Sequence, residues 1–116
     1  MEISHRRLSR ADVVSLNGRL DAAGASPLKE QIDSLFAQGR YRIVLDLSGL
    51  EALSSAGLRV LADARKRARD PKLTNLEGGD IRIAGPSAYI REILDLTGFT
   101  TMFEIYPDTL EAVGSF

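Results

Sequence analysis

Residues 43–62, which read IVLDLSGLEALSSAGLRVLA, constrain the fold more than any other stretch of this chain. The apolar run Ile43–Leu45 predicts a buried strand, and the apolar spacing through Leu61 predicts an amphipathic helix after it. Ser54 and Ser55 fall where that helix begins. Because a helix start has unpaired N–H groups and the positive end of the helix dipole, it accepts a side-chain oxygen or an attached phosphate. These serines are therefore either ordinary N-caps or parts of a switch.

The composition is that of one ordinary globular domain spanning residues 1–116. Hydrophobic residues make up 44% of the chain and charged residues 27%, and there is no cysteine, which excludes disulfides and thiolate chemistry. Fifteen basic residues against sixteen acidic ones give a net charge of −1, so no general attraction to nucleic acid or to anionic lipid is expected. With no signal-peptide core and no membrane-spanning apolar run, we expect a cytoplasmic protein.

The first half of the chain predicts a hairpin, a helix and a central strand. Residues 3–8 and 13–16 read as two pairing strands. Ser26 and Pro27 have the chemistry of an N-cap and a first helical residue, which predicts a helix from Pro27 to about Gln38. The strand of residues 43–45 should be interior to the sheet and should end at Asp46, where a loop leads to the serines.

The second half predicts two more strands, near residues 81–84 and 103–105, a helix that stops near Gly98, and a last short helix capped by Asp108. The fold class is therefore α/β, a single domain with a mixed sheet of about four to five strands packed with about four helices. Residues 69–80 form the one long connection. We expect its residues 72–79 to be removable at about 1 kcal/mol, because the entropy of a flexible loop changes slowly with its length.

Enzymatic function has little support in the sequence. His5 is the only histidine, and residues 53–57 lack the first glycine of a Gly-x-Ser-x-Gly elbow, which makes a serine hydrolase remote. Phosphate-binding glycine motifs and metal-ligand spacings are absent. The basic cluster of residues 65–69 ends a helix and has no interleaved aromatic residue, which is typical of a solvated helix end. We predict no catalytic residue, no metal and no cofactor.

Several short motifs, in order, resemble the STAS domain of bacterial anti-sigma factor antagonists. They are Gly18-Arg19-Leu20-Asp21, Val44-Leu45-Asp46-Leu47-Ser48-Gly49-Leu50, Ser55-Ala56-Gly57-Leu58, Ala84-Gly85-Pro86 and Leu94-Asp95-Leu96-Thr97-Gly98-Phe99. Each motif is weak alone, but their order and spacing span almost the whole chain. The resemblance implies a stand-alone regulatory module that binds a serine-kinase anti-sigma factor and is inactivated when the kinase phosphorylates a serine at a helix start.

The matching acceptor is Ser55. The resemblance also implies a partner-binding surface around it, made of Asp21, Ser54, Ser55, Ala56, Gly57 and Arg59, and a phosphatase as a further partner. The chain departs from the family pattern at Ser54, where an aspartate is usual, so a negative charge beside the acceptor is lost and Ser54 is an alternative acceptor. We expect the small Ala56 and Gly57 to leave room for a kinase active site.

One alternative from another functional class stays open. A small-ligand or nucleotide-binding sensor could use the same helix start to hold a phosphate. Stabilisation by a nucleotide in the absence of any partner protein would favour that sensor. The sequence leaves the identity of the partner and the oligomeric state open.

Overall fold

The computed structural model describes all 116 residues, which form one five-stranded sheet with five helices. The strands are β1 (Glu2–Arg7), β2 (Asp12–Leu20), β3 (Arg42–Leu53), β4 (Asp80–Ala84) and β5 (Ile105–Tyr106). The helices are α1 (Ala22–Ala37), α2 (Ser55–Ala68), α3 (Ala88–Leu96), α4 (Phe99–Met102) and α5 (Thr109–Gly114). The mixed α/β class is confirmed. The fifth helix is the four-residue α4, which the sequence did not predict.

The sheet has the spatial order β1-β2-β3-β4-β5. Strands β1 and β2 pair antiparallel as the predicted hairpin, while the remaining neighbours pair parallel. β3 is the central strand, and its Ile43–Leu45 are fully buried. Because parallel strands need crossover connections, α1, α2 and α3 all begin at the edge of the sheet where β2, β3 and β4 end.

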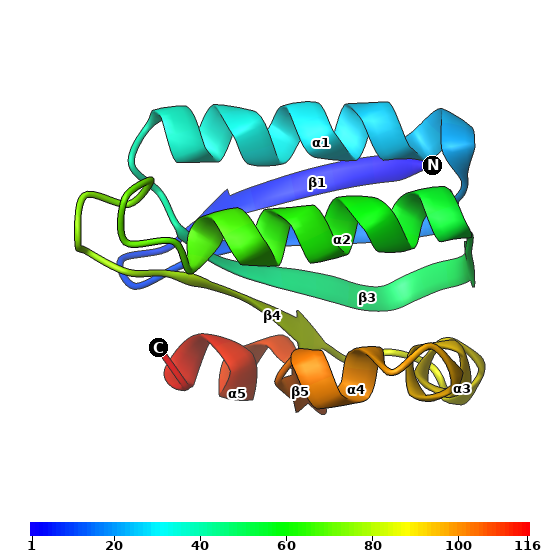
Figure 1. Ribbon diagram of the computed structural model, residues 1–116. Helices are drawn as coiled ribbons and strands as arrows, with labels where there is room; N and C mark the ends of the chain where they lie inside the picture. The colour runs from blue at the N-terminus through cyan, green and yellow to red at the C-terminus, as the bar shows by residue number, and fades with distance from the viewer.

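Two apolar clusters lie on opposite faces of the sheet. The larger contains buried residues of β2, β3, β4, α1, α2 and α3, among them Leu28, Ile32 and Leu61. The smaller joins Val13, Val44, Ala84 and Ala112, so α5 covers the other face. Figure 1 shows α1 and α2 side by side over the sheet, with α3, α4 and α5 beyond β4. None of the helices is long and apolar enough to cross a membrane.

Helix α1 begins five residues before the predicted position. Asp21, not Ser26, is its N-cap, since the Asp21 carboxylate accepts hydrogen bonds from the N–H groups of Ala23 (3.1 Å) and Gly24 (3.2 Å). Pro27 lies inside the helix. The helix can begin as soon as β2 ends at Leu20, because aspartate is as good an N-cap as serine.

Strand β3 is also longer than predicted, and continues past Asp46 to Leu53. Its register against β2 shifts between Ser15 and Asn17, where Asp46 and Gly49 are the respective partners on β3. In a regular strand the buried residue after Leu47 would be residue 49. The bulge adds one residue, so Leu50 is buried instead, and the alternation of buried and exposed residues in the sequence is interrupted.

The connection from α2 to β4 is folded, contrary to the expectation of a dispensable loop. Thr74 is fully buried there. Its hydroxyl donates a hydrogen bond to the carbonyl of Asp70 (3.1 Å) and accepts one from the N–H of Gly78 (3.1 Å). Removing residues 72–79 would therefore remove a buried, hydrogen-bonded residue as well as loop length.

Candidate functional site

The two serines lie at the start of α2, as predicted, but in different environments. Ser54 is the N-cap, with extended backbone angles, and is half-buried. Its Oγ accepts a hydrogen bond from the N–H of Gly57 at 3.3 Å, and its own N–H donates to the Leu20 carbonyl at 2.9 Å. Ser55 is exposed, and its hydroxyl makes no hydrogen bond within the chain. Of the two serines, only Ser55 is fully exposed.

Gly57 is buried against the end of β2 rather than open to a partner. A Cβ at this position would lie 2.6 Å from Cγ of Leu20 and 3.0 Å from the Leu20 carbonyl oxygen. Those separations are shorter than van der Waals contact, so only glycine lets the first turn of α2 approach β2 this closely. The expectation that Gly57 gives room to a kinase is therefore wrong. Its small size serves internal packing.

Asp21 lies on the same edge of the sheet as the serines. Leu20 on β2 pairs with Leu53 on β3. Asp21 follows Leu20 and Ser54 follows Leu53, so the two residues lie at the ends of neighbouring strands. Both residues cap helices, and Ser87 caps α3 at the same edge of the sheet. The structure thus places Asp21 and residues 54–57 at one edge of the sheet, which is the grouping that the family resemblance implies. The Asp21 carboxylate is engaged in capping α1, and the residue itself is exposed.

The charges around α2 favour an anion at its start. The first turn of α2 contains no acidic residue. Arg59 is exposed and forms no ion pair, whereas Arg67 is tied to Asp33 of α1 (2.8 Å) and to Asp63 (2.9 Å). One residue of the basic cluster at the other end of α2, Arg67, therefore holds α2 to α1 through its ion pair with Asp33. The positive end of the helix dipole at Ser55 faces no competing carboxylate on its own helix.

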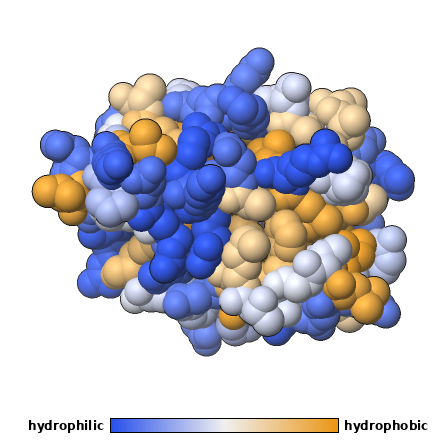
Figure 2. All heavy atoms as spheres, viewed as in Figure 1, coloured by the Kyte–Doolittle hydropathy of each residue, from blue (hydrophilic) through white to orange (hydrophobic).

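An apolar area that the sequence did not predict adjoins this helix. Figure 2 shows it at the right of the face viewed, over the region where α2, α3 and α4 lie in Figure 1. Tyr89, Leu96 and Met102 of α3 and α4 are 60%, 80% and 39% exposed. The half-buried apolar residues of these helices include Leu58 and Ile93. The buried residues of α3 are Ile90 and Leu94, and Leu96 does not share their face of the helix. A leucine on the polar face of a predicted helix is the feature of the sequence that could have revealed this apolar area.

The start of α2 presents an exposed hydroxyl with no catalytic group hydrogen-bonded to it. The hydroxyl of Ser55 has no base or acid hydrogen-bonded to it, and His5 is engaged with Asp12 on β2. No group of three or more histidine, aspartate or glutamate side chains is placed to hold a metal ion. The site is therefore an exposed hydroxyl without hydrogen bonds at a helix start, next to an exposed apolar area.

Comparison with known proteins identifies the family of the chain. The family model described as "Mlab, STAS domain" matches residues 3–105. BtrV of Bordetella bronchiseptica, a candidate anti-sigma factor antagonist, is 26% identical over 116 residues, which are 100% of this chain and 95% of BtrV. The anti-sigma-F factor antagonist RsfB of Mycobacterium tuberculosis is 40% identical over 50 residues, or 43% of this chain and 41% of RsfB.

Solved structures share the fold. A candidate anti-sigma factor antagonist of Thermotoga maritima has a TM-score of 0.83 at 22% identity, covering 97% of this chain and 92% of its own. An anti-sigma factor antagonist of Mycobacterium paratuberculosis has a TM-score of 0.78 at 29% identity, covering 98% of this chain and 92% of its own. SpoIIAA of Bacillus in its phosphorylated form has a TM-score of 0.71 at 18% identity, covering 98% of each chain. The likenesses at 22% and 18% identity establish the fold alone.

Proposed function

The chain belongs to the STAS domain family, and from that premise we propose that residues 1–116 act as an anti-sigma factor antagonist in the cytoplasm. In this proposal the domain binds a serine-kinase anti-sigma factor through the start of α2. The kinase then transfers the terminal phosphoryl group of ATP to Oγ of Ser55, with release of ADP and of the hydroxyl proton, and the complex dissociates. The names of the relatives BtrV and RsfB support this class of function.

The observation that carries the proposal is the difference between the two serines. Oγ of Ser54 accepts the capping hydrogen bond from Gly57, and Ser54 is half-buried. Ser55 is exposed and its hydroxyl is free of hydrogen bonds within the chain. Phosphorylation of Ser54 would replace the cap, whereas phosphorylation of Ser55 leaves the cap in place. Ser55 is therefore the acceptor in this proposal, although Ser54 replaces the aspartate of the family pattern.

The switch needs no change of fold. A phosphate brings about −1.5 to −2 charges, and at the start of α2 it meets unpaired N–H groups and the positive end of the dipole. The helix therefore tolerates it. A partner surface that covers Ser55 would have to bury the same charge, at a cost of at least several kcal/mol if no cation pairs with it. Since each 1.4 kcal/mol is about tenfold in affinity, a micromolar complex would be lost.

The docking surface in this proposal combines the polar helix start with the apolar area. Ser55, Arg59 and Asp21 supply its polar part at the edge of the sheet. The small Ala56 lies beside Ser55, and the buried Gly57 lets this turn of α2 pack on β2. The exposed apolar side chains of α3 and α4 supply the kind of surface that marks a protein interface. A phosphatase that hydrolyses the phosphoserine would restore binding and complete the cycle.

Titration calorimetry with the cognate kinase-type anti-sigma factor tests the proposal. We expect Ser55→Glu to bind roughly tenfold to hundredfold more weakly than Ser55→Ala, because a buried carboxylate without a partner costs about 1.4–3 kcal/mol. Ser4→Glu is a matched control, since Ser4 is an exposed serine on the outer strand β1. It adds the same charge away from the helix start and should bind like the unmodified protein. Equal affinities of Ser55→Glu and Ser55→Ala would place Ser55 outside the interface and refute the proposal.

A further inference from the structure

A polar cavity of about 380 Å³ lies at the edge of the sheet where the parallel strands begin. Its walls include Arg10, Asp12, Arg40, Tyr41, Arg42 and Glu77. A second cavity, of about 230 Å³, adjoins it and shares Arg42 and Glu77. Together they form a recess that runs from the β1–β2 turn to the connection between α2 and β4. We call it the arginine recess.

The arginine recess is far from Ser55. Arg42 is the first residue of β3, and Ser55 lies two residues beyond Leu53, the last residue of the same strand. Strand β3 has twelve residues, which at about 3.3 Å per residue span at most roughly 40 Å. Figure 1 shows the connection after α2 at one end of the molecule and the start of α2 at the other. Nothing in the proposed switch at Ser55 uses this recess.

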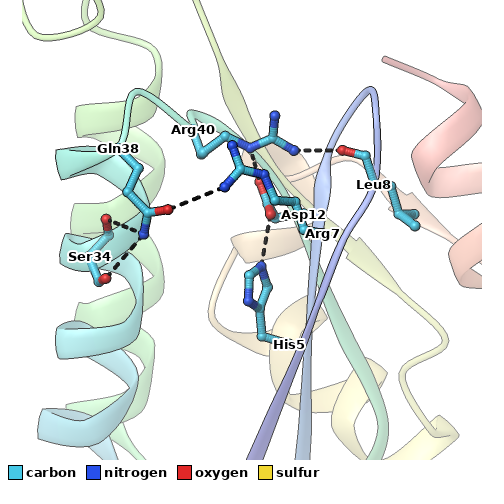
Figure 3. A network of polar contacts seen from close by, with 7 residues as sticks. All are labelled: His5, Arg7, Leu8, Asp12, Ser34, Gln38 and Arg40. Carbon is cyan, nitrogen blue, oxygen red and sulfur yellow. Dashed lines mark hydrogen bonds and ion pairs between the residues drawn. The ribbon is translucent and has the colours of Figure 1, made fainter.

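One arginine of the recess is held rigidly. Asp12 is 1% exposed, and its two carboxylate oxygens lie 2.8 Å from Nε2 of His5 and 2.7 Å from Nε of Arg40. Arg40 also donates from Nη2 to the Leu8 carbonyl at 2.6 Å. Figure 3 shows this network, with Arg7 beside it donating to Gln38, the C-cap residue of α1. Because Asp12 uses both oxygens internally, its charge is already compensated, and Arg40 is fixed in place before any ligand arrives.

Arg82 and Asp80, which line the second cavity, pair with each other at 3.2 Å. The remaining charges of the recess are free. Arg10 and Arg42 form neither an ion pair nor a side-chain hydrogen bond within the chain, and neither does Glu77. In the larger cavity three guanidinium groups face two carboxylates. Because Arg40 and Asp12 pair with each other, Arg10 and Arg42 are left facing Glu77 alone. The recess has an excess of positive charge and of unused N–H donors, and guanidinium groups match the oxygens of a phosphate in geometry.

We propose that the arginine recess binds the phosphate group of a small phosphorylated molecule, through Arg42 and Arg10 with Arg40 as a fixed third cation. The volume is within the range of small-molecule sites, and a concave wall suits a small molecule better than a protein surface. Tyr41 is half-buried, and its ring packs on Phe36 at 5.6 Å between centroids. That ring offers an aromatic surface beside the arginines for the base of a nucleotide.

An NMR titration of the full-length, isotope-labelled protein tests this inference. The probes are inorganic phosphate, AMP and adenosine, at constant ionic strength and neutral pH. We expect saturable shifts of the amides of residues 9–12, 39–42 and 77–79 with phosphate and with AMP, and none with adenosine, which lacks the phosphate. Tighter binding of AMP than of phosphate would identify the ligand as a nucleotide. Equal affinities would mean that the phosphate group alone is recognised.

Two variants separate this site from the start of α2. Arg42→Gln should raise the dissociation constant at least tenfold, since a charge-assisted contact is lost. Arg59→Gln removes the same charge from an exposed position on α2 and should leave binding unchanged. The spectrum of each variant reports its folding directly. Shifts confined to residues 54–57, loss of binding in Arg59→Gln but not in Arg42→Gln, or no saturable shift up to about 10 mM of either phosphate probe would overturn the inference. None of these results bears on the calorimetry at Ser55.

Discussion

Replacing Gly57 by alanine tests whether the start of α2 is positioned by close packing on β2. In a helix that had space for a methyl group, this change would stabilise the fold by up to about 1 kcal/mol through helix propensity. Here the added Cβ would lie 2.6 Å from Cγ of Leu20 and 3.0 Å from the Leu20 carbonyl oxygen. Leu20 is fully buried, and its carbonyl accepts the hydrogen bond from Ser54, so neither atom can move away without disturbing the core or the cap.

Overpacking of a dense core typically costs about 1–3 kcal/mol. Since the clash involves backbone as well as side chain, we expect it to outweigh the propensity gain and to leave a net loss of about 1–2 kcal/mol. Urea unfolding monitored by circular dichroism measures this as a lower midpoint at unchanged slope. Gly114→Ala is the matched control, because Gly114 is also helical and its Cβ would meet nothing within 4 Å. A Gly57→Ala protein as stable as the unmodified protein would refute the packing argument.

Three further predictions concern stability. Asp12→Ala should lower the free energy of unfolding by about 2–4 kcal/mol, because Arg40 is left without its buried partner, and urea unfolding measures it. Thr74→Val should cost about 1–2 kcal/mol in the same assay, while Thr74→Ser, which keeps the hydroxyl, should cost less. The hydrogen bond from Lys29, with help from Arg67, holds the pKa of Asp33 below its ordinary value. Asp33 thus contributes stability above the pKa of the unfolded chain and loses it as pH falls through the lower folded pKa. Asp33 is 38% exposed, so Asp33→Asn should cost less than about 1 kcal/mol at neutral pH, and unfolding curves below about pH 4 should show the difference shrinking.

The parts of the fold that local chemistry determines were predictable. The run Ile43–Leu45 is the core of the central strand, α2 starts at Ser55, and Asp108 caps the last helix by accepting the N–H of Glu111 at 2.8 Å. Each of these three features depends on the spacing of apolar residues, or on a capping side chain, within a few residues of the feature itself. The order of elements follows from these local signals, and so does the assignment to a mixed α/β sheet.

The errors occur where contacts distant in sequence decide between local signals. Ser26 followed by Pro27 is a valid helix start, but Asp21 caps α1 first because β2 ends beside β3 at Leu20. The bulge that lengthens β3 depends on its pairing with β2, which no spacing within β3 reveals. Thr74 looks like any loop residue until its turn folds around it.

The candidate site was predictable in the same partial way. The two serines could be placed at a helix start, and the resemblance to the family placed Asp21 near the same surface. That Asp21 itself caps a helix could not be predicted. The packing role of Gly57 and the apolar area with Leu96 and Met102 could not be predicted, because both depend on which helices lie side by side. The free hydroxyl of Ser55 and the engaged hydroxyl of Ser54 likewise become distinct only in the folded chain.

Mass spectrometry of the protein purified from its own cells tests the central claim most directly. Cleavage after Arg42 and Arg59 releases one peptide, residues 43–59, which contains Ser48, Ser54 and Ser55. Fragmentation of that peptide locates any phosphate among the three hydroxyls. Our account predicts a phosphate on Ser55, and its appearance there when the purified protein is incubated with the cognate kinase and ATP. A phosphate on Ser54 or Ser48, or a peptide that stays unmodified in the presence of the active kinase, would contradict it.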